Sequence, residues 1–187
     1  MAAAGIFENK LLLAMPLMTD PRFERSVIYM CSHDESGAMG LVVNRAFSQL
    51  TFEDLLDQLS ISTDADVPNL SIHAGGPVEP GRGFVLHSAD FVQESTLIVS
   101  QTLALTATVD ILKALAEGEG PMHHLLALGY AGWGPGQLEE EVQNNAWMIA
   151  EPDDEILFNT ELDLKWPRAM AMLGIDVAML SSDAGHG

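Results

Sequence analysis

The chain has 187 residues, of which 48% are hydrophobic, and its 27 acidic and 8 basic residues give a formal net charge of −19. This length and apolar content predict one domain with a packed core and exclude a disordered polypeptide. Nucleic acids and anionic membranes are themselves negatively charged, so the net charge argues against both as partners.

The start of the chain and its cysteine content indicate a cytoplasmic protein. Residues 1–18 lack a basic region before their apolar run, which Pro16 interrupts, and this is a poor signal peptide. No stretch approaches the roughly 20 apolar residues that a membrane span needs. Cys31 is the only cysteine, which excludes an intramolecular disulfide and is typical of a reducing compartment.

The first predicted elements are strands. Residues 10–18 read as a buried strand that enters an extended loop at Pro16. Residues 26–33 and 38–45 are two apolar runs on either side of a turn that contains Gly37, and this pattern predicts a β-hairpin.

Two helices are predicted further along. Residues 51–59 begin with Thr51 and carry Asp54 three positions later, which is close to a capping box. Residues 106–121 form the strongest helical pattern, with Thr106 or Thr108 as the N-cap. We expect its buried stripe to consist of Val109, Leu112 and Leu115.

The other elements are short strands and helices. We expect strands within residues 95–106, as one bent strand or two pieces, and at 123–132 and 146–152. Residues 162–176 are helical at their end, with Pro167 tolerated only in the first turn. The tail from about residue 181 is expected to be loose. Strands interspersed with short helices, without regular alternation, indicate an α+β fold for a single domain over residues 1–187.

Residues 129–147 combine Gly, Pro and Trp with three consecutive glutamates. Pro135 suits the first turn of a short helix, and carboxylates near its start favour the positive end of the helix dipole. We therefore interpret Trp133 as a packing anchor and Glu139, Glu140 and Glu141 as a solvated face.

Residues 70–88 read as strand, turn and strand. Their glycines resemble a phosphate-binding loop, but no helix follows and no Gly-Lys-Ser/Thr is present. A hairpin turn is the favoured interpretation.

No local pattern assembles a catalytic or metal site. Cys31 reads as a small buried hydrophobe, and the Gly-x-Ser-x-Gly and His-Glu-x-x-His motifs are absent. His33 and the acids beside it are interpreted as the polar tip of a hairpin. The sequence predicts no catalytic residue, no metal and no cofactor.

Three of the eight bases lie close to the predicted hairpin. Arg25 enters its first strand, and Asn44 and Arg45 leave its second, so pairing brings them to the same end; Arg22 lies nearby. Two interpretations stay open. The arginines pair with local carboxylates, or they form a small site for an anion or a partner.

Several of these segments together resemble a known family. Residues 11–45, 73–88, 128–148 and 156–158 and the closing Leu-Gly pair resemble the motifs of the bacterial YqgE/AlgH family, in the same order. The resemblance implies a compact α+β fold with a bifurcated, mostly antiparallel sheet rolled into a pseudo-barrel and flanked by short helices. The family is labelled a transcriptional regulator, without an established enzymatic activity or cofactor.

The resemblance also marks positions that are candidates for binding. They are Arg25, Asn44, Arg45, Gly75, Gly76, Pro77 and Trp133. A basic stripe and a helix-turn-helix pattern, which a DNA-binding regulator would carry, are absent from the sequence.

The leading hypothesis is a non-catalytic regulatory or adaptor protein whose partner is another protein. The alternative is an enzyme or small-molecule-binding protein with a pocket near the first hairpin and residues 75–78. Direct regulation of transcription, as the family label suggests, ranks last because of the charge. The sequence leaves the oligomeric state open.

Overall fold

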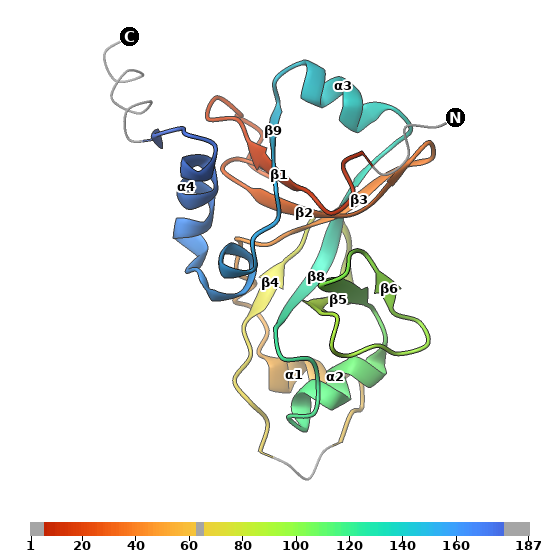
Figure 1. Ribbon diagram of the computed structural model, residues 1–187. Coiled ribbons are helices and arrows are strands. Elements are labelled where there is room, and N and C mark those ends of the chain that lie inside the picture. The colour runs from red at the N-terminus through yellow and green to blue at the C-terminus, as the bar shows by residue number, and fades with distance from the viewer. Residues whose placement is uncertain (1–5, 63–65, 178–187) are drawn as a thin grey trace. The chain divides into compact units, whose positions relative to one another are not determined.

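The computed structural model describes residues 6–62 and 66–177, so the expectation for the tail lies outside the described residues. The chain divides into two compact units. The first contains Met1–Asn44 and Gly132–Gly187, and the second contains Arg45–Ala131. Figure 1 labels the elements of both units. The single-domain expectation stays a prediction.

The first unit contains an antiparallel sheet with the strand order β3-β2-β1-β9. Its strands are β1 (Leu11–Ala14), β2 (Val27–Asp34), β3 (Gly37–Val42) and β9 (Trp147–Ala150). The predicted hairpin is confirmed, with Tyr29 opposite Leu41. All four residues of β1 are buried, because this strand lies between β2 and β9 and has both faces covered.

Among the described residues, the first unit also contains two α-helices of seven residues or more and a π-helical turn. They are α3 (Gln137–Gln143), α4 (Leu162–Met172) and η1 (Glu155–Asn159). The prediction for Pro167 was wrong, because this proline lies inside α4 and not in its first turn. Trp166, Ala169 and Met170 on the same helix are buried, and this packing offsets the hydrogen bond that the proline removes.

The second unit contains the strand order β6-β7-β5-β8, with β4 paired to β8. Its strands are β4 (Ile72–Ala74), β5 (Val78–Ser88), β6 (Leu97–Ile98), β7 (Leu103–Thr106) and β8 (His124–Trp133), whose last two residues belong to the first unit. Residues 95–106 form two strands, which pair with each other.

The hairpin expected within residues 70–88 was wrong. β4 and β5 do not form a hairpin, because both pair with β8: Ala74 in parallel and Gly83 in antiparallel fashion with the same residue, Leu128. The intervening turn therefore carries the chain from one side of β8 to the other.

The helices of the second unit share one apolar cluster. They are α1 (Phe52–Gln58) and α2 (Val109–Ala116). The capping box of α1 is confirmed, since the Thr51 side chain accepts a hydrogen bond from the Asp54 amide and the Asp54 side chain accepts one from the Thr51 amide. In α2 the expected stripe was wrong at Val109, which is 49% exposed, whereas Leu112 and Leu115 are buried.

Both units combine mostly antiparallel strands with short helices. The predicted α+β class is therefore confirmed, and the parallel pairing of β4 with β8 is the exception among the strand pairs described.

Candidate functional site

Asn44 and Arg25 meet at the open end of the first hairpin, as the hairpin prediction requires. The Asn44 side chain accepts a hydrogen bond from the Val27 amide through Oδ1 and donates one to the Arg25 carbonyl through Nδ2, both at 2.9 Å. Arg25 has a φ of +55°, in the left-handed region that non-glycine residues rarely adopt. The amide of Asn44 therefore holds a strained backbone conformation at the entry to β2.

The guanidinium of Arg25 stacks on an indole. Its Cζ lies 4.9 Å from the centre of the Trp166 ring, and the arginine is exposed. Trp166 is buried, and its Nε1 donates a hydrogen bond of 2.9 Å to the Ala14 carbonyl, which ties α4 to β1. The ring under Arg25 is thus immobilised by the core of the first unit.

Arg45 begins the second unit. Its carbonyl accepts a hydrogen bond of 2.8 Å from the Ala74 amide and so links this segment to β4. The expected grouping of Arg25 with Arg45 stays a prediction, because the two residues belong to different units.

Gly75, Gly76 and Pro77 form the turn between β4 and β5, where the chain passes close to β8. The Gly75 amide donates to the Leu128 carbonyl at 2.8 Å. A Cβ added to Gly76, which has a φ of +154°, would clash with the carbonyl group of Tyr130. Backbone approach therefore explains these glycines without a bound phosphate, and Pro77 is exposed beside them.

Trp133 is a packing anchor, as predicted, and a glutamate holds it. The Trp133 ring is 7% exposed and lies edge-on to the Trp147 ring at 6.1 Å. Oε1 of Glu141 accepts hydrogen bonds from both indoles, at 3.0 Å from Trp133 and 2.9 Å from Trp147. Its Oε2 accepts a third from Gln137 at 2.8 Å.

The interpretation of the three glutamates as a solvated face was therefore wrong for Glu141, whereas Glu140 is exposed and the Glu139 side chain is 36% exposed. Glu141 binds the two indoles, and Glu139 Oε2 lies 3.3 Å from His33 Nε2. The helical spacing of α3 directs these carboxylates to aromatic residues on other segments, and the sequence carries no local signal for that contact.

The interpretation of the polar hairpin tip was wrong for His33, which is buried, whereas Asp34 and Glu35 beside it are exposed. The Nδ1 of His33 accepts a hydrogen bond of 3.3 Å from the Phe7 amide, which places the ring proton on Nε2. Nε2 faces Glu139 within ion-pair distance, but the angle does not meet that of a hydrogen bond.

Lys165 is a buried base that sequence reasoning missed. The residue is 2% exposed, and its Nζ donates hydrogen bonds of 2.8 Å to the carbonyls of Val43 and Leu157. Burial disfavours the charged form and lowers the pKa of this amine to about 8. The only sequence signal for this burial is that Lys165 shares the buried side of α4 with Trp166, Ala169 and Met170.

A chain of polar side chains inside the second unit was also missed. His87 donates through Nδ1 to the Ser88 carbonyl at 2.8 Å, so its Nε2 accepts from the Thr106 hydroxyl at 2.7 Å. Thr106 lies 2.8 Å from the hydroxyl of Thr96, which itself accepts from the Gln93 amide. Burial lowers the pKa of His87, which keeps the ring neutral. The network joins β5 to β7 and satisfies polar groups that would otherwise be buried alone.

Cys31 behaves as the sequence predicts. The residue is 1% exposed, and burial raises the pKa of its thiol to about 12, so the thiolate needed for nucleophilic chemistry does not form near neutral pH.

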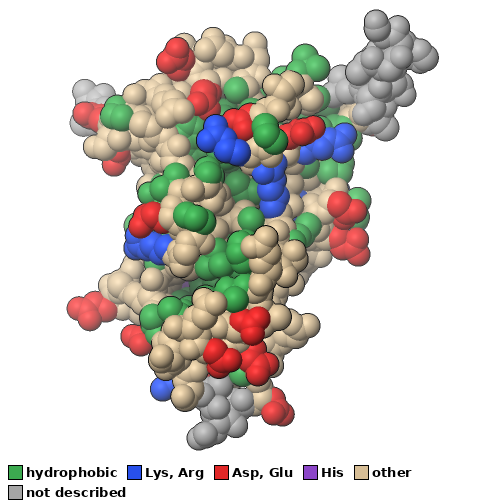
Figure 2. Space-filling view, turned by 180° about the vertical axis from the view of Figure 1, so that it is seen from behind, with side chains coloured by type: hydrophobic (Ala, Val, Ile, Leu, Met, Phe, Trp, Pro, Cys, Tyr) green, Lys and Arg blue, Asp and Glu red, His purple; other side chains and the backbone are tan. Residues whose placement is uncertain are grey.

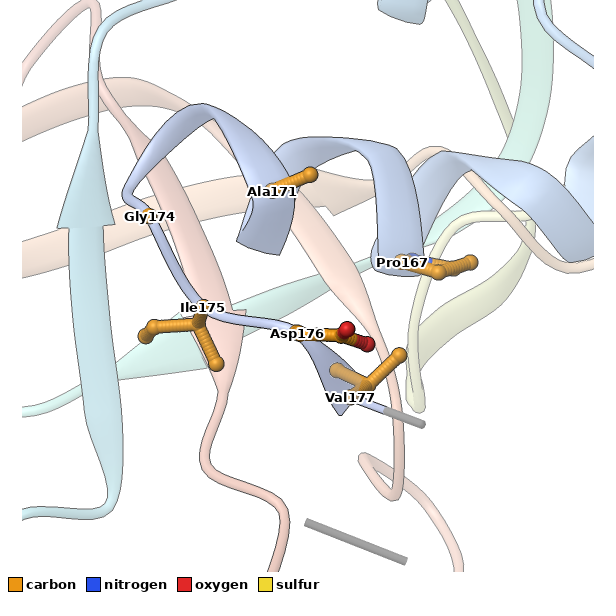
Figure 3. Close-up of a pocket in the computed structure, with 6 residues that line it drawn as sticks. All are labelled: Pro167, Ala171, Gly174, Ile175, Asp176 and Val177. Atoms are coloured by element: carbon orange, nitrogen blue, oxygen red, sulfur yellow. The ribbon is translucent and has the colours of Figure 1, made fainter. Parts of the chain in front are cut away.

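A hollow of about 380 Å³ lies beside α4 in the first unit. Figure 3 shows Pro167 and Ala171 on the helix and Ile175, Asp176 and Val177 on the segment after it. Its lining is mainly apolar, with Asp176 as the acidic group, and it lacks the convergent polar groups that orient a ligand. The pocket expected near the first hairpin and residues 75–78 stays a prediction, because those segments belong to different units.

Within the described residues, no three His, Cys, Asp or Glu side chains come close enough to hold a metal ion. A search of the same residues found no helix whose length and apolar character would let it cross a membrane.

The comparisons with known proteins agree with this α+β architecture and define the family. The family model described as AlgH-like matches residues 11–178, so this chain belongs to the AlgH-like family. A UPF0301 protein of Methylobacterium sp. is 51% identical over 99% of this chain and 92% of its own length. A UPF0301 protein of Bradyrhizobium diazoefficiens is 48% identical over 99% of this chain and 90% of its own length.

Solved structures support the same assignment. The solution structure of the AlgH protein from Pseudomonas aeruginosa is 42% identical, with a TM-score of 0.78 over 94% of this chain and 93% of that one. A crystal structure of a Corynebacterium diphtheriae protein has a TM-score of 0.70 at 20% identity, over 88% of this chain and 85% of that one. At that identity the second likeness shows the fold alone.

Proposed function

We propose that this protein is a non-catalytic regulatory or adaptor protein of the cytoplasm that acts by binding another polypeptide. The observation that carries the proposal is how the eight basic residues are used. Lys165 is buried, and Lys10, Arg22 and Arg82 form ion pairs. Half of the bases therefore add little to the positive potential of the surface, while the chain carries 27 acids.

The distribution of the exposed charges supports a basic partner. On the face shown in Figure 2, Lys and Arg side chains are interspersed with Asp and Glu side chains and do not form a continuous positive field. In the second unit, α1 and α2 expose several acids against one base, Lys113. These acids are Glu53, Asp54, Asp57 and Asp110. A surface of this sign accelerates encounter with a basic polypeptide and repels phosphate backbones.

Three of the candidate residues have structural contacts that require no catalytic role. Gly76, Trp133 and Asn44 are each accounted for by contacts that hold the fold together. The two buried groups with lowered pKa values, His87 and Lys165, donate their protons to backbone carbonyls, and each is almost fully shielded from solvent.

Two experiments test the proposal. Tagged protein is incubated with bacterial lysate at moderate salt, and the retained proteins are compared with those on an equally acidic control protein. We expect specific enrichment of a polypeptide, and its absence would remove the support for the proposal. A gel shift with duplex DNA at physiological salt tests the competing role in transcription. A specific, salt-sensitive complex would favour that role over the binding of a polypeptide.

A further inference from the structure

Three arginines of this chain stack on aromatic rings, and they differ in what neutralises them. Arg22 lies 5.4 Å from the ring centre of Phe23, and Arg82 lies 5.1 Å from that of Phe84. Each also has a carboxylate: Asp20 lies 2.8 Å from Arg22, and Glu79 lies 3.7 Å from Arg82. For Arg25, stacked on Trp166, no carboxylate of the described residues lies within ion-pair distance.

This difference is notable in a chain with 27 acids. The neighbouring Glu24 and Asp20 would be the natural partners of Arg25, yet Asp20 binds Arg22 through both of its oxygens. The backbone of Arg25 is left-handed, and its side chain lies over Trp166. The nitrogens of its guanidinium thus keep N–H donors available to a ligand.

The local structure also limits the motion of this group before any ligand arrives. Asn44 clamps the backbone on both sides of Ser26, through the Arg25 carbonyl and the Val27 amide. The indole beneath the guanidinium is buried and hydrogen-bonded to Ala14. Arg25 is exposed above this ring. A guanidinium binds carboxylate or phosphate oxygens through two parallel hydrogen bonds.

We propose that Arg25, stacked on Trp166 and clamped by Asn44, is a binding site for an oxyanion, either a carboxylate or a phosphate group. The net charge of −19 opposes polyanions at long range, so the site suits a ligand with one or two negative charges and excludes a nucleic-acid backbone. The site lies wholly within the first unit and does not depend on the proposed polypeptide partner.

Nuclear magnetic resonance of the arginine Nε–Hε groups tests this site directly. The intact ¹⁵N-labelled protein is titrated with sodium acetate and, separately, with inorganic phosphate, while sodium chloride holds the ionic strength constant. We expect the Arg25 Nε–Hε signal to shift saturably. The signals of Arg22 and Arg82 should move much less, because each of these guanidinium groups already has a carboxylate beside it. Arg25→Lys keeps the charge but removes the fork of donors, so we expect binding to weaken about tenfold.

The matched control is Arg82→Lys, which alters a stacked arginine that already has a carboxylate and should leave the titration of Arg25 unchanged. Backbone signals in the same spectra report whether each variant is folded. Saturation with phosphate alone assigns the site to phosphate groups, saturation with acetate alone assigns it to carboxylates, and saturation with both supports either ligand. A linear response to both salts, or equal shifts at all three arginines in the wild-type protein, would overturn the proposal.

Discussion

The buried amine of Lys165 makes a specific prediction about the pH dependence of stability. Its pKa is about 8 in the folded protein, against 10.5 for an unperturbed lysine. Between these two values the unfolded chain binds more protons than the folded one. The free energy of unfolding contributed by this group therefore rises with pH across this window.

The expected magnitude follows from the difference between the two pKa values. One pKa unit corresponds to about 1.4 kcal/mol, so the full window contributes about 3 kcal/mol, of which about 1 kcal/mol falls between pH 7 and pH 9. Cys31 and Tyr29 act in the opposite direction at alkaline pH, because burial raises both of their pKa values. The wild-type profile alone therefore does not isolate the lysine.

A comparison of wild-type protein with Lys165→Met isolates the contribution of Lys165 to the pH dependence. The free energy of unfolding is measured by urea denaturation at pH 7, 8 and 9, with linear extrapolation to water. We expect the wild-type protein to gain about 1 kcal/mol over the variant between pH 7 and pH 9. Lys113→Met makes the same change at an exposed position of α2 and should run parallel to wild type. A difference between wild type and Lys165→Met that does not change with pH would refute the reasoning.

Three further predictions concern other parts of the fold. Glu141→Ala leaves two buried indole N–H groups without an acceptor, so the free energy of unfolding should fall by about 2–4 kcal/mol. Glu140→Ala, at an exposed position of the same helix, should have little effect. Equal urea midpoints for the two variants would contradict this prediction. Gly76→Ala forces a Cβ against Tyr130 and should destabilise the protein by about 3 kcal/mol. Gly81→Ala, where nothing lies within 4 Å of the added Cβ, should change the stability by no more than about 0.5 kcal/mol. Calorimetry distinguishes the two variants, and a Gly76→Ala variant as stable as wild type would contradict the close approach to Tyr130. Cys31 should react with a thiol reagent at pH 8 only after urea unfolding, and rapid reaction of the native protein would contradict its burial.

Local patterns in the sequence predicted those elements whose signals are themselves local. The first hairpin follows from two apolar runs around a turn with Gly37, and the α1 cap follows from Thr51 and Asp54. Val109 was misplaced because the start of α2 projects from the core, whereas its next turn packs into the apolar cluster. Pro167 was misplaced because tertiary packing outweighs helix propensity.

The remaining differences come from contacts between residues that are distant in sequence. The turn at Gly75 and Gly76 reads as a hairpin until β8 is known to lie between the strands that it joins. Glu141 looks solvated until Trp133 and Trp147 are brought to it. The hydrogen-bond partners of Lys165 cannot be read from the sequence, because they are backbone carbonyls, which carry no residue-specific signal.

The candidate site was predictable in part. The sequence indicates that Arg25 and Asn44 meet at one end of a hairpin, and the structure adds Trp166, which lies far along the chain. Periodicity within a single segment cannot show such a stacking partner. Gly75, Gly76 and Trp133, which the family resemblance also marked, have structural contacts that account for them.

The central claim, that this acidic protein works through a polypeptide and not through nucleic acid, is tested most directly by one capture experiment. Tagged protein is exposed to lysate with and without nuclease treatment, washed at 100 mM and at 500 mM salt, and the retained material is identified by mass spectrometry and nucleic-acid staining. The account predicts a basic protein that survives nuclease and is released at the higher salt concentration, because its binding depends on opposite charges. Retained nucleic acid, or partners that disappear after nuclease treatment, would contradict it.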